Sequence, residues 1–305
     1  MTTRPSNGEP AQGSGGSRGA REIIELVGLV IAPATLLTAL LFYFGWTRSR
    51  AQAAYFGVDA DLLGRSSQEY VLRSISSIFW PLTLLLVGML LALAAHAGAK
   101  KLADTKHVHL LLVLAACGLV AGASLIIFAV LGVVWRPRAG GGAVLTPAAF
   151  AVGIPVAAYA LFLAFSVASK PGASHLDPLP RAELWLIAGL FCVFTFWTVG
   201  NYANFRGRTL AERTATHLNR LPSVIVYSRQ RIYLEGWGVE ETALNGSNAA
   251  YHFRYTGLKL LARAGNRSFL LPNGWCRTDR NQTCHHNGVA FVLQDDPALR
   301  LDFAP

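Results

Sequence analysis

Two cysteines followed by two histidines form the group in this chain whose spacing most suggests chemistry. Seven residues separate Cys276 from Cys284, and His285 and His286 follow directly. An oxidising compartment would join the cysteines in a disulfide, whereas a reducing one would leave free thiols. Zinc is a third interpretation, but structural zinc sites usually carry paired ligands at both ends of the motif, and here only one end is dense. The spacing therefore favours the disulfide.

Motifs that define familiar enzyme classes are missing from the sequence. It has no G-x-S-x-G nucleophile elbow, no P-loop and no H-E-x-x-H zinc-protease helix. The neighbouring Asp295 and Asp296 are more typical of a turn than of a catalytic pair. We therefore expect no catalytic, cofactor-binding or metal site, and a protein that is not an enzyme.

The composition is that of a membrane protein. Hydrophobic residues make up 52% of the chain and charged residues only 14%, against about 25% charged in soluble domains. The net charge of +10 is spread evenly, since residues 206–305 hold 13 Lys/Arg and 8 Asp/Glu. A nucleic-acid binder would concentrate such charge in one patch. Basic residues that meet anionic headgroups beside membrane spans are the ordinary interpretation.

Five stretches without Asp, Glu, Lys or Arg are long enough to cross a bilayer. A membrane helix needs about 20 apolar residues, and a charge at its centre costs about 2.5–3.5 kcal/mol. Residues 22–205 are thus predicted to form a five-helix transmembrane domain, with the fourth helix at about Pro147–Ser169. The stretches are Leu26–Trp46, Ser74–Ala99, His107–Trp135, Ala139–Ser169 and Leu184–Phe205.

Polar and small residues within these stretches predict packing rather than transport. None of the stretches holds an acidic residue or a lysine for an ion relay, which counts against a coupled transporter or pump. Gly118 and Gly122 form a G-x-x-x-G pair that lets helices approach closely, either within the chain or between two copies. Cys117 and Cys192 lie in mid-helix, where cysteine behaves as a small hydrophobic residue.

The segments around the first span have different characters. Residues 1–21 are rich in Gly, Ser, Pro and Arg and are predicted to be a disordered tail. The segment Thr47–Arg73 mixes aromatic, aliphatic and charged residues, which suits a short stretch lying on the membrane surface. Within it, Ser66 and Glu69 match a capping box, so a helix should start at Ser66 and run into the second span.

Residues 206–305 are predicted to form a small, soluble, mostly antiparallel β domain. Their apolar runs are short, partly alternating, and separated by turn residues. Gly265-Asn266 is typical of a hairpin turn between two of them. The expected strands are Val224–Tyr227, Ile232–Leu234, Tyr251–Tyr255, Leu258–Ala262, Ser268–Leu271, Val289–Leu293 and Leu299–Phe303. The fold class is therefore an α-helical membrane protein with about five transmembrane helices and this C-terminal β domain.

Some of these segments also resemble those of a known group of proteins. Ala32–Leu37, Phe42–Trp46 and Tyr55–Asp59 look like parts of uncharacterised multi-pass membrane proteins of actinobacteria. Leu221–Ser228 is similar to the opening of their C-terminal domain. The resemblance covers most of residues 25–305. It implies this architecture in a cell membrane, and it brings no activity with it.

An odd number of crossings places the two ends of the chain on opposite sides. The basic cluster Lys100–Lys106 favours a cytoplasmic N-terminus. The disulfide interpretation of Cys276 and Cys284 favours an extracytoplasmic C-terminal domain. The count of positive charges near the spans, 8 on the cytoplasmic side of this arrangement and 10 on the other, leans slightly toward the opposite orientation.

Two classes of function fit this architecture. The first is a non-enzymatic membrane protein whose C-terminal domain binds or senses an envelope partner or ligand. The alternative is a channel or an uncoupled small-solute carrier that works through the spans. The expected partners are the lipid bilayer and an envelope protein, with no nucleic acid, and the sequence does not decide the oligomeric state.

Overall fold

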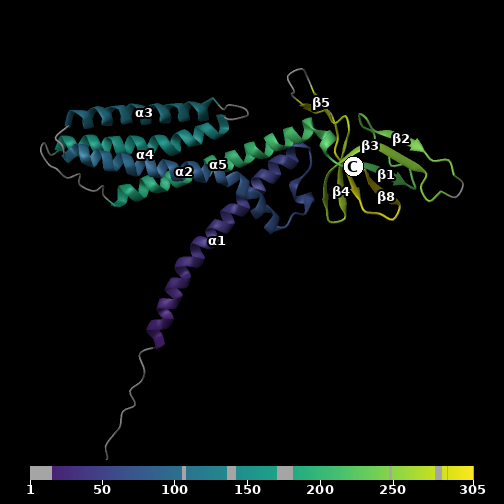
Figure 1. Cartoon of the computed structure of the whole chain (residues 1–305), viewed down its shortest axis with the longest axis horizontal. Coiled ribbons are helices and arrows are strands. Elements are labelled where there is room, and N and C mark those ends of the chain that lie inside the picture. Colours follow the sequence, from purple (N-terminus) through teal and green to yellow (C-terminus); the bar gives the residue numbers. More distant parts are fainter. Residues whose placement is uncertain are drawn as a thin grey trace, which may run out of the picture.

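The chain folds into a series of long helices followed by a sheet domain (Figure 1). A computed structural model describes residues 16–104, 108–135, 142–169, 181–246, 249–278, 284–286 and 288–304. The side chains of residues 16–30 are outside this description. The long helices are α1 (Gly16–Tyr55), α2 (Ser67–Asp104), α3 (Val108–Val134), α4 (Gly142–Ser169) and α5 (Arg181–Thr216), and the short 3-10 helices are η1 (Ala60–Leu63) and η2 (Leu218–Arg220).

Among the described residues, four helices are long and apolar enough to cross a membrane. They are α2 from Ile78 to Leu102, α3, α4 and α5. Their outer surfaces are covered by exposed Leu, Val, Ile and Phe side chains, as expected where lipid replaces water. The first predicted span, Leu26–Trp46, falls within α1, but its residues 26–30 belong to the part whose side chains are not described.

Helices α2 to α5 run side by side, whereas α1 meets them only near the sheet domain and diverges toward its N-terminus (Figure 1). Glycines permit the two crossings of α1. A Cβ atom built on Gly45 would lie 1.9 Å from the carbonyl oxygen of Tyr70 in α2, and one built on Gly207 of α5 would lie 2.3 Å from that of Arg48. Only a residue without a side chain allows the backbones to come so close.

One helix end agrees with the predicted boundary, and two others differ. The N–H of Glu69 donates to Ser66 Oγ at 3.3 Å, which confirms the predicted cap in front of α2. In contrast, α1 begins at Gly16, inside the predicted tail 1–21, and the rest of that tail lies outside the described residues. Helix α5 continues to Thr216, past the predicted domain boundary at residue 206. Extending an existing helix costs far less than nucleating one, so helices can run on beyond their apolar stretches.

The segment Thr47–Arg73 requires a correction to the prediction. It was expected to lie on the membrane surface, but α1 continues through it to Tyr55, and Phe56, Val58 and Leu63 are then buried. Their partners belong to the sheet domain. Apolar side chains are buried in a protein core rather than left in the headgroup region when such a core is adjacent. The sequence did not show that the sheet domain provides a core next to this segment.

The C-terminal domain is an antiparallel sheet, in agreement with the prediction. Its strand order is β7-β4-β3-β1-β8, with β2 paired to the beginning of β3, while β5 and β6 form a separate hairpin. The strands are β1 (Ser223–Ser228), β2 (Glu240–Ala243), β3 (Phe253–Ala264), β4 (Arg267–Pro272), β5 (Cys276–Thr278), β6 (Cys284–His286), β7 (Phe291–Gln294) and β8 (Leu299–Ala304).

Three details of the sheet depart from the expected strands. Two predicted strands, Tyr251–Tyr255 and Leu258–Ala262, are parts of the single strand β3, which passes through Gly257 at φ +80°. Ile232–Leu234 is a loop instead of a strand, and Tyr233 adopts φ +49° there. Strand β2 was not predicted, because its four residues are all exposed and show no alternation. The predicted turn at Gly265 does join β3 to β4.

Strand β4 separates two apolar cores. Phe269 and Leu271 face the helix ends, whereas Leu270 joins Val224, Tyr255 and other residues on the opposite face of the sheet. All three β4 side chains are fully buried. This alternation is the period of two of a β-strand, and it places one face of β4 against the membrane domain.

Candidate functional site

The sheet domain and the helix ends share one apolar core. Ala211 and Ala215 of α5 pack with Phe269 and Leu271 of β4, and with Phe56 after α1. The ring of Trp275 lies 5.0 Å from that of Phe56 and 5.9 Å from that of Tyr55, measured between centroids. Because Trp275 and Phe56 are both almost completely buried, the sheet domain is seated on the helices and is not attached by a flexible linker.

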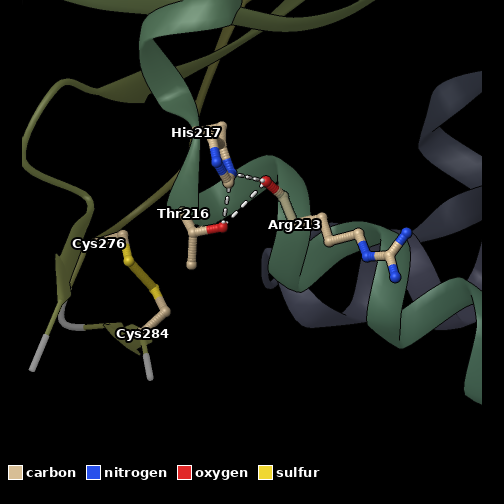
Figure 2. Close-up of a disulfide and its surroundings, with 5 residues drawn as sticks. All are labelled: Arg213, Thr216, His217, Cys276 and Cys284. Carbon is tan, nitrogen blue, oxygen red and sulfur yellow. Dashed lines mark hydrogen bonds between the residues drawn. A yellow bond between two sulfur atoms is a disulfide. The ribbon is translucent and has the colours of Figure 1, made fainter. Parts of the chain in front are cut away.

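A small polar network ends α5 and turns the chain into the sheet domain. Thr216 Oγ1 donates to the carbonyl oxygen of Arg213 at 3.1 Å, and His217 Nδ1 lies 3.0 Å from that hydroxyl (Figure 2). Cys276 and Cys284 lie beside this turn and form the expected disulfide, with their α-carbons 5.3 Å apart (Figure 2). The bond ties β5 to β6, and both strands contact α5.

A groove of about 770 Å³ lies between α1 and α5, directly below the sheet domain. Tyr43, Trp46, Thr47, Arg50, Ala51 and Ala54 of α1 form one wall, Asn204, Arg208 and Glu212 of α5 form the other, and Tyr55, Phe56, Gly57, Trp275 and Gly288 close the end under the sheet. Its volume is within the range of about 300–1,000 Å³ that ligand sites usually occupy.

The helical repeat explains why these residues share a groove. Residues three or four positions apart lie on the same side of a helix, and the α1 wall from Tyr43 to Ala54 follows this spacing. Asn204, Arg208 and Glu212 each lie four residues apart on α5. The alignment depends on α1 and α5 both continuing past their uncharged stretches, since Arg50 and Arg208 would otherwise belong to loops.

Two arginines give the groove its positive character. The guanidinium of Arg50 lies over the Trp46 ring, 5.0 Å from its centroid, an arrangement that holds the charge in place. Among the residues that the structure describes, no carboxylate is within ion-pair distance of Arg50 or Arg208. Both side chains are exposed, so their charges are available to a ligand.

Neutral polar groups in the groove can also donate hydrogen bonds. The Thr47 hydroxyl is buried and has no hydrogen-bond partner among the described residues. Burial, and secondly the negative charge of Glu212, raise the pKa of Tyr55 above its ordinary value of 10.0. The Tyr55 hydroxyl therefore keeps its proton at neutral pH. A negatively charged group in the groove would lie among Arg50, Arg208 and Tyr55.

The groove lies where two uncharged stretches end, Leu26–Trp46 in α1 and Leu184–Phe205 in α5. Trp46 ends the first predicted span, and Arg50 is four residues further along α1, or about 6 Å. Asn201 Nδ2 donates to the carbonyl oxygen of Ala143 at 2.8 Å, so the start of α4 and this turn of α5 are level. Arg208 is less than two turns beyond Asn201. Both arginines therefore follow closely on the ends of the predicted spans.

A second basic cluster on α1 serves packing. Arg48 Nη1 donates to the carbonyl oxygen of Arg73 at 2.7 Å, across the crossing of α1 and α2. Burial, followed by the charges of Arg73 and Arg206, lowers the pKa of Arg48 from its ordinary value. Arg73 in turn binds Glu69 at 2.9 Å. These contacts hold the two helices together and leave few polar groups of this cluster for a ligand.

The other residues singled out from the sequence do not assemble into a site. The side chains of His285 and His286 are outside the described part, and no cluster of three metal-ligating residues exists among those described. A Cβ atom on Gly122 would lie 2.7 Å from the Ala157 nitrogen of α4, so the Gly118–Gly122 face packs against that helix. Asp295 binds Arg263 at 2.7 Å, and Asp296 accepts the N–H of Ala298, which is a turn.

Comparison with known proteins finds no family model, no curated protein and no solved structure that matches this chain. Its function must therefore be inferred from the groove and its surroundings.

The groove was not predicted from the sequence, although one signal was present. Tyr43, Trp46, Thr47, Arg50 and Ala54 keep the helical spacing without interruption past the end of the span. This pattern indicates that the helix continues and presents one mixed aromatic and basic face. The residues on α5 and Trp275 are far away in the sequence, and only the fold brings them to the same place.

Proposed function

We propose that this chain is a non-enzymatic integral membrane protein that crosses the bilayer five times. Its C-terminal domain, seated on the ends of α1 and α5, binds or senses a ligand or partner of the cell envelope. The observation that carries the proposal is the core shared by Phe56, Trp275 and α5, with the groove beside it. A domain fixed in this way can pass a change in the groove directly to the helices.

A fifth crossing is consistent with the arrangement of the helices. The uncharged stretch Leu26–Trp46 lies in α1, which is 40 residues long. Helices α3 and α5 run toward the sheet domain, as α1 does, whereas α2 and α4 run away from it (Figure 1). Five crossings would put the N-terminus and the sheet domain on opposite sides of the membrane. We place the sheet domain outside, where its disulfide would persist.

A photo-crosslinking experiment tests the proposed binding. A photoreactive amino acid replaces Ala54, which is exposed inside the groove, and in a second variant it replaces Arg213, which is exposed on α5 outside it. Irradiation of native membranes should attach a ligand or partner at Ala54 and not at Arg213, as measured by the mass of the labelled peptides. Equal labelling at the two positions, or none at Ala54, would contradict the proposal.

A channel or uncoupled carrier remains the alternative function, and a flux measurement tests whether the spans conduct protons. The predicted spans contain no Asp, Glu, Lys or Arg, so we expect purified protein in liposomes to show no proton flux under an imposed pH gradient. Flux above that of empty liposomes would favour transport. The full chain is needed for this test, because removing residues 217–305 would expose the apolar ends of α1 and α5.

A further inference from the structure

We infer that the groove between α1 and α5 binds the phosphate headgroup of an anionic phospholipid whose acyl chains stay in the bilayer. This inference rests on the proposed function and names its ligand class. Three properties of the groove lead to it: its charge, its position across the membrane boundary, and the change from apolar to polar residues along its length.

The charge of the groove selects an anion. Arg50 and Arg208 approach from opposite walls, and Glu212 is the single carboxylate in the described lining. Arginine is suited to phosphate because its planar guanidinium can donate two parallel hydrogen bonds to neighbouring oxygens. Stacking on Trp46 restrains the Arg50 guanidinium before any ligand arrives.

The membrane end of the groove favours a lipid over a soluble phosphate ester. Tyr43 lines this end, and Leu36, two helical turns earlier on the same face of α1, is 63% exposed. The two residues belong to the predicted span, so their exposed faces contact hydrocarbon. An acyl chain can follow this surface from the groove into the bilayer without crossing a polar barrier. A soluble ester has no acyl chain to contact this apolar surface.

The opposite end of the groove limits the size of the headgroup. Phe56 and Trp275 close it beneath the sheet domain, and both are held by the shared core. The lipid phosphate would therefore lie against the same side chains that fix the sheet domain on the helices. This position links headgroup binding to the orientation of the domain.

Lipid binding is tested on the full-length protein in neutral detergent micelles. A short-chain phosphatidylglycerol is titrated and the bound complexes are counted by native mass spectrometry, with the matching phosphatidylcholine as the neutral lipid. The test variant is Arg50→Gln with Arg208→Gln. The control variant is Arg213→Gln with Arg220→Gln, which removes the same charge from exposed positions outside the groove.

The expected result is a preference for phosphatidylglycerol that the control variant keeps. The groove variant should bind it about 25-fold more weakly, at about 5-fold for each arginine. Equal binding of the two lipids, or equal loss in both double variants, would overturn the inference. Glycerol phosphate is titrated in parallel. If it binds as tightly as the lipid, the groove recognises a soluble ester and the lipid assignment is wrong.

The result also separates this inference from the proposed function. A protein or a soluble molecule crosslinked at Ala54, together with no lipid preference, would leave the proposed function standing and remove the lipid. Absence of crosslinking at Ala54 would contradict both.

Discussion

At the scale of single residues, glycines allow the two close helix crossings of α1. Helix α1 passes over the first turn of α2 at Gly45 and against α5 at Gly207, where no Cβ atom fits. Glycine is unfavourable within a helix by about 1 kcal/mol relative to alanine, so its presence at crossings indicates that close packing outweighs this cost. Other glycines, such as Gly88 in α2, have no described atom within 4 Å of the position that a methyl group would take, and they provide controls.

Replacing Gly45 with alanine should destabilise the protein by about 1–3 kcal/mol, because the added methyl group collides with backbone that must move as a whole. Gly88→Ala is the matched control and should be neutral or slightly stabilising. Thermal unfolding of the two variants in the same detergent measures the difference. Equal unfolding temperatures would show that α1 and α2 do not cross as closely as described.

The disulfide is a second feature at this scale. Closing a loop of about nine residues stabilises the folded state by roughly 2.6 kcal/mol through the entropy of the unfolded chain. Cys276→Ser with Cys284→Ser should therefore lower the stability of the sheet domain by about that amount. The control replaces Cys117 and Cys192, which are free thiols, with alanine. Peptide mapping after alkylation without reductant checks the bond itself, and it is refuted if both Cys276 and Cys284 carry the alkyl group.

At the scale of elements, the extension of two helices past their uncharged stretches determines the site. Helix α1 reaches Tyr55 and α5 reaches Thr216, and their last turns form the walls of the groove as well as the seat of the sheet domain. The loop after α1 supplies Phe56, which is 3% exposed. Membrane domain and sheet domain should therefore unfold as coupled units.

Phe56→Ala tests this coupling. Removing a buried Phe ring costs about 3–5 kcal/mol, and here the loss falls on the contact between the helix ends and Trp275. The sheet domain should become sensitive to limited proteolysis at the end of α5, between residues 216 and 222. Leu62→Ala, on the exposed side of η1, serves as the control and should change stability by about 0.5 kcal/mol or less. Unchanged proteolysis of the Phe56 variant would mean that the domains are held by other contacts.

At the scale of the whole molecule, the arrangement predicts which parts face outside. Single cysteines are introduced at Arg220 in the sheet domain and at Lys101 at the far end of α2, in a chain whose Cys117 and Cys192 are alanine. A membrane-impermeant maleimide applied to intact cells should label position 220 and spare position 101. Labelling of position 101 alone would reverse the orientation and keep the crossing number. Labelling of both would exclude five crossings.

The sequence alone determined the fold class of this protein, which is a helical membrane protein with a β domain. Placing a charge in hydrocarbon costs a large free energy, and this cost can be read from short stretches of the chain. Stretches without charged residues predicted the helices that the structure shows at membrane length, and alternating short runs predicted the antiparallel sheet. Other short patterns in the sequence located the cap at Ser66, the turn at Gly265 and the pairing of Cys276 with Cys284. These features depend on residues close together in the chain.

Only the tertiary structure decided where the sheet domain sits and what lies beneath it. Phe56, Arg208 and Trp275 are far apart in the sequence, and no local pattern shows that they share a core or a groove. The same limit explains the misplaced surface segment at Thr47–Arg73, since its apolar side chains suit a membrane surface and a protein core equally well. Which of the two they enter depends on the partner available after folding, and long-range packing alone provides that partner.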